Sequence, residues 1–198
     1  MKRVVVALLG PVAWSPPGIP REEWRRALAE DVVDLLSMLA AADPAIAVDP
    51  VDAALARAVA WPGMTVYEAA TPRAVLEAAA RDGYDQGAVV AGDAPDVPGM
   101  ILGKLLQPLE TRHAAVAPAH DGGLLGIASR LPVPEWLPDI DFDGSEFDGS
   151  PEALRAAAPR RALVAVTPGW HRLRGPGDLA RLDPALEGWD TTRALLSA

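Results

Sequence analysis

Short apolar runs alternate with helix-like segments along the chain, and this alternation constrains the fold more than any other feature of the sequence. Apolar runs bounded by Gly, Pro or Asp predict strands over residues 4–9, 45–48, 64–67, 87–91, 114–117, 123–129 and 162–166. Helical spacing and helix-start signals predict helices over residues 21–42, 51–60, 72–82, 98–109 and 152–158, and a helical tail from residue 178. We therefore expect an α/β fold with a mostly parallel central sheet and helices on both faces.

The composition indicates one core built from small side chains. The 198 residues are enough for one sizeable core, and no linker divides them, so we expect a single domain over residues 1–198. Half of the residues are hydrophobic but only 5% are aromatic, so the core consists mainly of Ala, Val and Leu. The run from Val4 to Leu9 is apolar throughout, which is typical of a strand covered on both faces.

The charge balance and the N-terminus narrow the class of partner. The net charge is −9, with 27 acidic residues against 18 basic ones, whereas binding to nucleic acid depends on clustered Lys and Arg. The absence of Cys excludes disulfides and thiolate chemistry. The N-terminal apolar run is too short for a signal peptide, and no segment approaches the length of a membrane span. We expect a cytoplasmic protein with no nucleic-acid or membrane partner.

Three predicted strand ends point to one ligand site. In open α/β sheets, ligands bind outside the carboxyl ends of the strands, where the strand order reverses. The segments that this rule brings together are Leu9-Gly10, Ala91-Gly92-Asp93 and the stretch from Ala117 to Asp121.

The turn Gly92-Asp93-Ala94-Pro95-Asp96 carries the strongest candidate residue. Asp93 directly follows a Val-Val strand, so its carboxylate lies at the expected ligand edge. There it is suited to accept a hydrogen bond from a ribose hydroxyl or to bind Mg²⁺. The alternative is that Asp93 only caps the turn that follows, which is a common task for Asp near Pro.

A second turn, Asp121-Gly122-Gly123, follows 28 residues later along the chain. Two glycines after an acid allow the backbone to approach a ligand closely or to adopt positive φ. The alternative is an ordinary Asp-Gly turn that joins two strands.

Together the two turns resemble the GT-A fold nucleotide-diphospho-sugar transferases, a Rossmann-like superfamily. Within it they are most similar to a bacterial glycosyltransferase-like family related to molybdenum-cofactor and phospholactate guanylyltransferases. The resemblance rests on Gly92-Asp93-Ala94-Pro95-Asp96-Val97-Pro98, then Pro118-Ala119-His120-Asp121-Gly122-Gly123, then Trp136, and it covers about residues 85–138. It implies a nucleotide or nucleotide sugar at the carboxyl edge of the sheet, with Mg²⁺ or Mn²⁺ as cofactor.

The resemblance also implies roles for individual residues. Asp93 and Asp121 are implied to be catalytic, with Asp93 as the metal ligand. Contacts to the substrate are implied for Gly10, Gly92, Asp96, Gly122, Gly123 and Arg174.

Two departures from the family pattern bear on catalysis. The family's N-terminal lysines are missing, and Arg21, Arg25 and Arg26 are the only nearby cations that could replace them; the alternative is that they form a solvated helix face. Arg172 and Arg174 stand where the family has its late metal-binding acids. An arginine cannot ligate Mg²⁺, so it either neutralises a phosphate directly or marks a site that has lost catalysis.

Two functions therefore remain open from the sequence. The first is an enzyme of the nucleotidyl- or glycosyl-transfer type, and the second is a non-catalytic relative that binds a ligand or partner. The segment 139–144 matches the first half of a calcium loop, but Ser150 stands where that loop needs a Glu, so a solvated acidic loop is the default. A lid over the sheet edge is a further alternative for this segment. His113, His120 and His171 form no zinc pattern.

Overall fold

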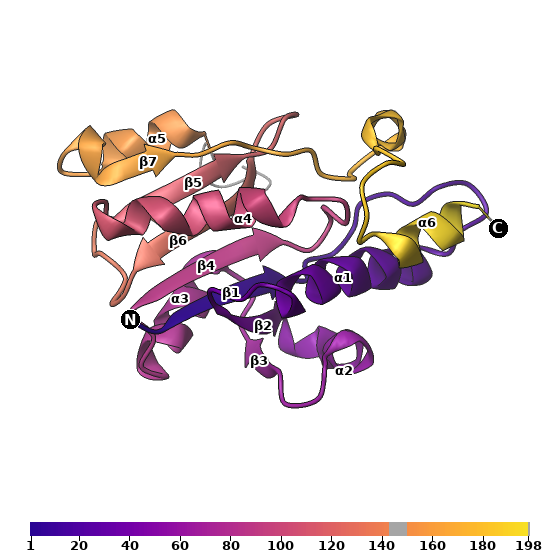
Figure 1. Cartoon of the computed structure of the whole chain (residues 1–198), viewed down its shortest axis with the longest axis horizontal. Coiled ribbons are helices and arrows are strands. Elements are labelled where there is room, and N and C mark those ends of the chain that lie inside the picture. The colour runs from indigo at the N-terminus through magenta and orange to yellow at the C-terminus, as the bar shows by residue number, and fades with distance from the viewer. Residues whose placement is uncertain (143–149, 198) are drawn as a thin grey trace.

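A seven-stranded sheet forms the centre of this computed structural model, which describes residues 1–142 and 150–197. The strand order is β3-β2-β1-β4-β6-β5-β7 (Figure 1). The strands are β1 (Arg3–Leu8), β2 (Asp43–Val48), β3 (Thr65–Glu68), β4 (Gln86–Ala91), β5 (Ala114–Pro118), β6 (Leu124–Arg130) and β7 (Val164–Val166). Every predicted strand is present, with its ends shifted by at most two residues.

The sheet is mostly parallel, as the sequence predicts, and β6 is the exception. β6 runs antiparallel to both of its neighbours, β4 and β5. Only five residues, 119–123, separate β5 from β6, and such a short connection can join only antiparallel strands. Since β5 is antiparallel to β6 as well, it runs parallel to β4, and its carboxyl end lies at the same edge of the sheet as those of β1 and β4.

Helices cover both faces of the sheet. They are α1 (Arg21–Ser37), α2 (Ala53–Val59), α3 (Pro72–Arg81), α4 (Gly99–Leu106), α5 (Pro151–Ala157) and α6 (Asp190–Leu196), with short 3₁₀ turns between them. The core cluster on one face joins the sheet to α1, α2 and α4, and the cluster on the other face joins it to α3 and α5. In Figure 1, α1 and α4 lie in front of the sheet.

Strand β1 shows why its sequence is apolar throughout. Val5 and Ala7 face the cluster with α1 and α4, whereas Val4 and Val6 face the cluster with α3. All four side chains are buried, because successive residues of a strand point to opposite faces and both faces are covered here.

The C-terminal part folds back onto α1. The predicted helical tail is a 3₁₀ turn over Pro176–Arg181 and, after a loop, helix α6. Asp31 of α1 is buried and accepts hydrogen bonds from the backbone N–H groups of Thr191 and Thr192, at 3.0 and 2.8 Å. Its carboxylate thus caps the N-terminal turn of α6. Within the described residues, no helix is both long and apolar enough to cross a membrane.

Candidate functional site

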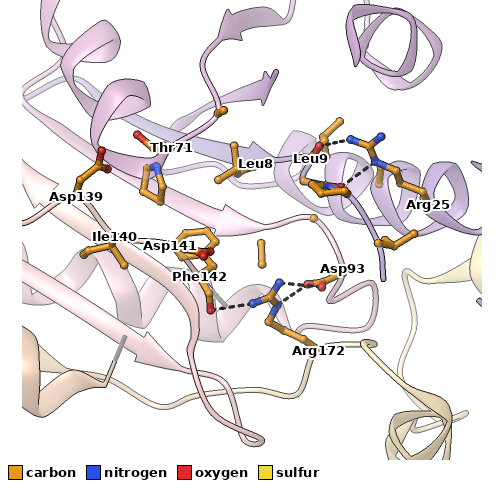
Figure 2. A pocket seen from close by; sticks show the side chains of 18 residues that line it. Leu8, Leu9, Arg25, Thr71, Asp93, Asp139, Ile140, Asp141, Phe142 and Arg172 are labelled. Atoms are coloured by element: carbon orange, nitrogen blue, oxygen red, sulfur yellow. Dashed lines mark hydrogen bonds and ion pairs between the residues drawn. The ribbon is translucent and has the colours of Figure 1, made fainter. Parts of the chain in front are cut away.

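A cavity of about 300 Å³ lies at the carboxyl ends of β1 and β4. The two strands end in register, Leu8 opposite Ala91, and the N–H of Gly92 donates to the carbonyl of Leu8 at 3.0 Å. The cavity is lined by residues 8–12, 70–72, 91–93 and 139–142, with Arg25, Ala29 and Arg172 (Figure 2). The cavity therefore lies outside the carboxyl ends of two strands, which is where ligands bind in open α/β sheets.

The Asp93 carboxylate is bound by Arg172. Nε of Arg172 donates to Oδ1 at 2.6 Å, and Nη2 donates to Oδ2 at 2.9 Å (Figure 2). The two side chains are 12% and 7% exposed, so this ion pair is shielded from water. Bidentate geometry between a guanidinium and a carboxylate gives both strength and a fixed orientation.

The same guanidinium also holds two backbone carbonyls. Nη1 of Arg172 donates to the carbonyl of Leu124 at 3.3 Å and to that of Phe142 at 3.1 Å. Arg172 thereby ties the end of β4 to the start of β6 and to the loop that follows β6.

Arg172 belongs to a short segment that binds the Asp93 turn along its length, and we call residues 170–173 the C-terminal strap. The N–H of Leu173 donates to the carbonyl of Asp93 at 2.8 Å. Nε1 of Trp170 donates to Oδ1 of Asp96 at 3.2 Å, and Nε2 of His171 lies 3.0 Å from the same oxygen without forming a hydrogen bond. Asp96 is buried by these contacts and does not line the cavity. Its predicted contact with substrate gains no support from this placement.

Gly10 and Gly92 both line the cavity, but a side chain would have different surroundings at the two positions. A Cβ on Gly92 would lie 2.9 Å from a methyl of Leu9 and 3.0 Å from the carbonyl oxygen of Leu8, so glycine is needed for the close approach of β1 and β4. A Cβ on Gly10 would meet nothing within 4 Å, and this glycine is exposed. Gly10 therefore leaves open space at the cavity.

Of the three arginines that could replace the missing lysines, only Arg25 lines the cavity. It donates to the carbonyls of Leu9 and Gly10, at 2.7 and 2.9 Å, and makes a bidentate pair with Asp52, at 2.9 and 2.6 Å. The hydrogen bond from Arg25 lowers the pKa of Asp52 below its ordinary value. Arg25 is thus a clamp on the loop after β1 rather than part of a solvated helix face, while Arg21 and Arg26 are exposed.

The second predicted turn lies at the same edge of the sheet but outside the cavity lining. Asp121 is exposed and pairs with Arg181 at 2.7 Å, and Nη2 of Arg174 donates to the carbonyl of Gly122 at 3.0 Å. Gly122 and Gly123 have φ values of 94° and 71°, as the two glycines led us to expect. A Cβ on Gly123 would lie 2.3 Å from the carbonyl oxygen of Phe142, so packing also requires this glycine.

The acidic groups of the cavity do not form an evident metal centre. In the part of the chain that the structure describes, no group of three or more His, Asp or Glu side chains is placed to hold a metal ion. Asp139 and Asp141 line the cavity across from the ends of β1 and β4. The rest of the half calcium loop, Asp143 and Gly144, lies outside the described residues.

Two features of the site were not recognised from the sequence. The Asp93–Arg172 pair joins residues 79 positions apart, and the only signal was that Arg172 stands where a related family has an acid. Asp139 and Asp141 were interpreted as half of a calcium motif, as a solvated loop or as part of a lid over the sheet edge, and they were not proposed as site residues; the structure places both in the cavity lining.

Comparisons with known proteins show the fold. The sequence matches no model of a protein family and no curated protein. Among solved structures, a nucleotide-diphospho-sugar transferase from Desulfovibrio desulfuricans G20 superposes with a TM-score of 0.70 at 19% identity, over 100% of this chain and 96% of that one.

Two further structures carry a nucleotide or a metal. CMP:2-keto-3-deoxy-manno-octonic acid synthetase, in complex with CTP, has a TM-score of 0.57 at 14% identity, over 99% and 98% of the two chains. A Mycobacterium tuberculosis H37Rv protein in complex with manganese has a TM-score of 0.56 at 15% identity, over 100% and 98%. The chain therefore has the fold of nucleotide-diphospho-sugar transferases and of related nucleotidyltransferases.

Proposed function

We propose that this protein is a nucleotidyl- or glycosyltransferase-like protein that binds a nucleotide or nucleotide sugar in the cavity beside Asp93. The observation that carries the proposal is the cavity itself, a concave site at the carboxyl ends of β1 and β4. Ligands of open α/β sheets bind at such an edge, and a protein of the same fold has been solved with CTP.

In this proposal different residues around the cavity contact different parts of the ligand. Gly10 has open space where a side chain would stand and leaves its backbone accessible to one part of the ligand, and Gly92 lines the cavity beside it. The neighbouring turn of Asp121, Gly122 and Gly123 would face the part that extends beyond the cavity, together with Arg174, which donates to the carbonyl of Gly122. Asp93 and Asp121 remain the predicted catalytic acids. Arg172 uses one acceptor site on each oxygen of Asp93, so a ligand hydroxyl would donate to the second site.

A second candidate is a relative that binds the ligand and does not catalyse transfer, and the Asp93–Arg172 pair favours it. Transfer of a phosphoryl or glycosyl group requires cations that neutralise the charge developing on the phosphates. Both arginines that line the cavity already have acidic partners, Asp93 for Arg172 and Asp52 for Arg25. Neither therefore brings an uncompensated charge to a phosphate.

Thermal-shift titration tests whether the cavity binds such ligands. Nucleoside triphosphates and nucleotide sugars are added to the protein, and a ligand that binds only the folded state raises the Tm. The Gly10→Leu variant places a side chain in the open space of the cavity and should abolish the shift. Gly103→Leu is the matched control, since Gly103 also has open space around it but lies on α4, away from the cavity.

The outcomes separate the two candidates. A Tm shift that Gly10→Leu removes, together with release of pyrophosphate or nucleoside diphosphate, supports a transferase. The same shift without release of either product supports the binding protein. If no nucleotide or nucleotide sugar moves the Tm of the wild-type protein, both candidates are refuted.

A further inference from the structure

The position beside Asp93 is already occupied by a cation. A carboxylate that binds Mg²⁺ or Mn²⁺ gives at least one oxygen to the ion. Both oxygens of Asp93 instead accept charge-assisted hydrogen bonds from Arg172, at 2.6 and 2.9 Å. Each oxygen keeps a second lone pair, but a divalent ion bound there would lie beside the guanidinium, and repulsion between the two cations opposes its binding.

The guanidinium is fixed in that place by more than Asp93. Its Nη1 donates to the carbonyls of Leu124 and Phe142, and the next residue, Leu173, donates its N–H to the carbonyl of Asp93. A metal ion that took the place of Arg172 would have to release four side-chain hydrogen bonds and leave two buried carbonyls without this donor.

Among residues 1–142 and 150–197, the other acids of the cavity do not offer a replacement site. Asp139 and Asp141 are the remaining acidic side chains of its lining, and they form no group of three candidate ligands with Asp93 within the described residues.

We propose that Arg172 is a built-in substitute for a divalent cation at Asp93, so that ligand binding at this edge is independent of Mg²⁺ and Mn²⁺. The cation that neutralises Asp93 at the end of β4 is then a side chain, and its position does not depend on the concentration of metal. The part of this inference that concerns the ligand rests on the proposed function above, whereas the part that concerns the metal does not.

Uptake of Mn²⁺, followed by the loss of the free-ion signal in electron paramagnetic resonance, tests the metal part without any nucleotide. Wild-type protein and Asp93→Asn should give the same titration curve, because Asp93 contributes no metal site. Arg172→Asp places a second carboxylate beside Asp93 and should take up a single Mn²⁺ per chain, with a rise in Tm on addition of the ion.

Arg112→Asp is the control for the change of net charge. Arg112 is exposed, precedes β5 at the opposite edge of the sheet, and donates to the carbonyl of Ala162. This variant carries the same added negative charge and should match the wild type in Mn²⁺ uptake.

Three results would overturn the inference. The first is Mn²⁺ uptake by the wild type that Asp93→Asn removes. The second is a nucleotide-induced Tm shift that disappears on chelation with EDTA. The third is a folded Arg172→Asp variant that takes up no more Mn²⁺ than Arg112→Asp. If Arg172→Asp does not fold, the comparison of wild type with Asp93→Asn still decides the matter. A wild type that binds neither nucleotide nor Mn²⁺ refutes the proposed function and leaves the metal part supported.

Discussion

Replacing Arg172 by Met should destabilise the protein strongly, because it leaves the Asp93 carboxylate buried without its cation. Methionine keeps most of the aliphatic length and removes the charge and all the donors. Breaking a buried ion pair by removing one partner costs about 3–5 kcal/mol. An exposed pair is worth only about 0–1 kcal/mol, but the two side chains here are 12% and 7% exposed, so the buried value applies.

A double-mutant cycle separates the ion pair from packing. Asp93→Asn removes the full negative charge that Asp93 places against the buried arginine and should cost a similar amount. If the two losses were independent, the double variant would lose about 6–10 kcal/mol, twice the single cost. We expect a much smaller loss, because the second substitution removes the charge that the first one stranded.

Urea unfolding at neutral pH, followed by far-UV circular dichroism, gives the free energies. For a chain of this length, about 1 kcal/mol corresponds to about 2–4 °C in Tm, so Arg172→Met should lower the Tm by roughly 6–20 °C. Arg181→Met, which breaks the exposed pair with Asp121, is the control and should cost about 0–1 kcal/mol. A loss below about 1 kcal/mol for Arg172→Met, or additive losses in the cycle, would refute the reasoning.

Four other substitutions have expected outcomes that follow from local geometry. Gly122→Ala should lower the free energy of unfolding by about 1–2 kcal/mol, measured in urea, because φ is 94° and nothing lies near the new Cβ. Gly123→Ala should lower it more, because its Cβ would lie 2.3 Å from a carbonyl oxygen. Equal losses in the two variants would contradict this reasoning. Arg25→Met should return the pKa of Asp52 toward its ordinary 3.8, as followed by NMR titration of the carboxyl carbon. In the wild type that pKa is lowered on folding, so the stability from this pair is present above pH 3.8 and is lost as the pH falls through the lowered value; an unchanged pKa in the variant would count against the pair. Asp31→Ala removes the carboxylate that caps α6 and should make the C-terminal tail the first site of limited proteolysis, while an unaltered cleavage pattern would show that the cap is unimportant.

The strands and most helices were predictable because their signals are local. Thr71 followed by Pro predicts a helix start, and the Thr71 side chain does accept a hydrogen bond from the N–H of Ala74. The run Val4 to Leu9 predicts a strand covered on both faces, since no alternation of polar residues interrupts it. Such patterns report burial over a few neighbouring residues, and burial is what fixes these elements.

Properties that depend on distant partners were not predictable in the same way. The predicted helix over 21–42 ends at Ser37, although its apolar stripe continues to Leu39. The helical tail from residue 178 is interrupted before α6, whose position depends on the cap that Asp31 provides from α1. Composition alone does not show such contacts.

In the candidate site, too, the features with a local sequence signal were predictable and the contacts between distant residues were not. The sequence singled out the turn at Asp93, because a strand end followed by an acid is a local pattern, and Asp93 does line the cavity. That a ligand binds there stays a prediction. It left open whether Arg172 contacts a phosphate or marks a changed site, and the structure gives the described bonds of Arg172 to Asp93 and to two backbone carbonyls. Asp121 was paired with Asp93 by resemblance, yet its carboxylate is directed to Arg181.

The C-terminal strap has a consequence for the order in which the chain acquires its structure. During synthesis, β1 to β6 leave the ribosome before residues 170–173, and N-terminal parts of a chain tend to fold first. Until the strap arrives, Asp93 and Asp96 lack the partners that Trp170 and Arg172 provide. We expect the nascent sheet to expose two neighbouring acids at its ligand edge, and the edge to close only when the last quarter of the chain has been made. A translation-arrested chain that stops before Trp170 should therefore keep this edge open to protease, and one that extends past α6 should protect it.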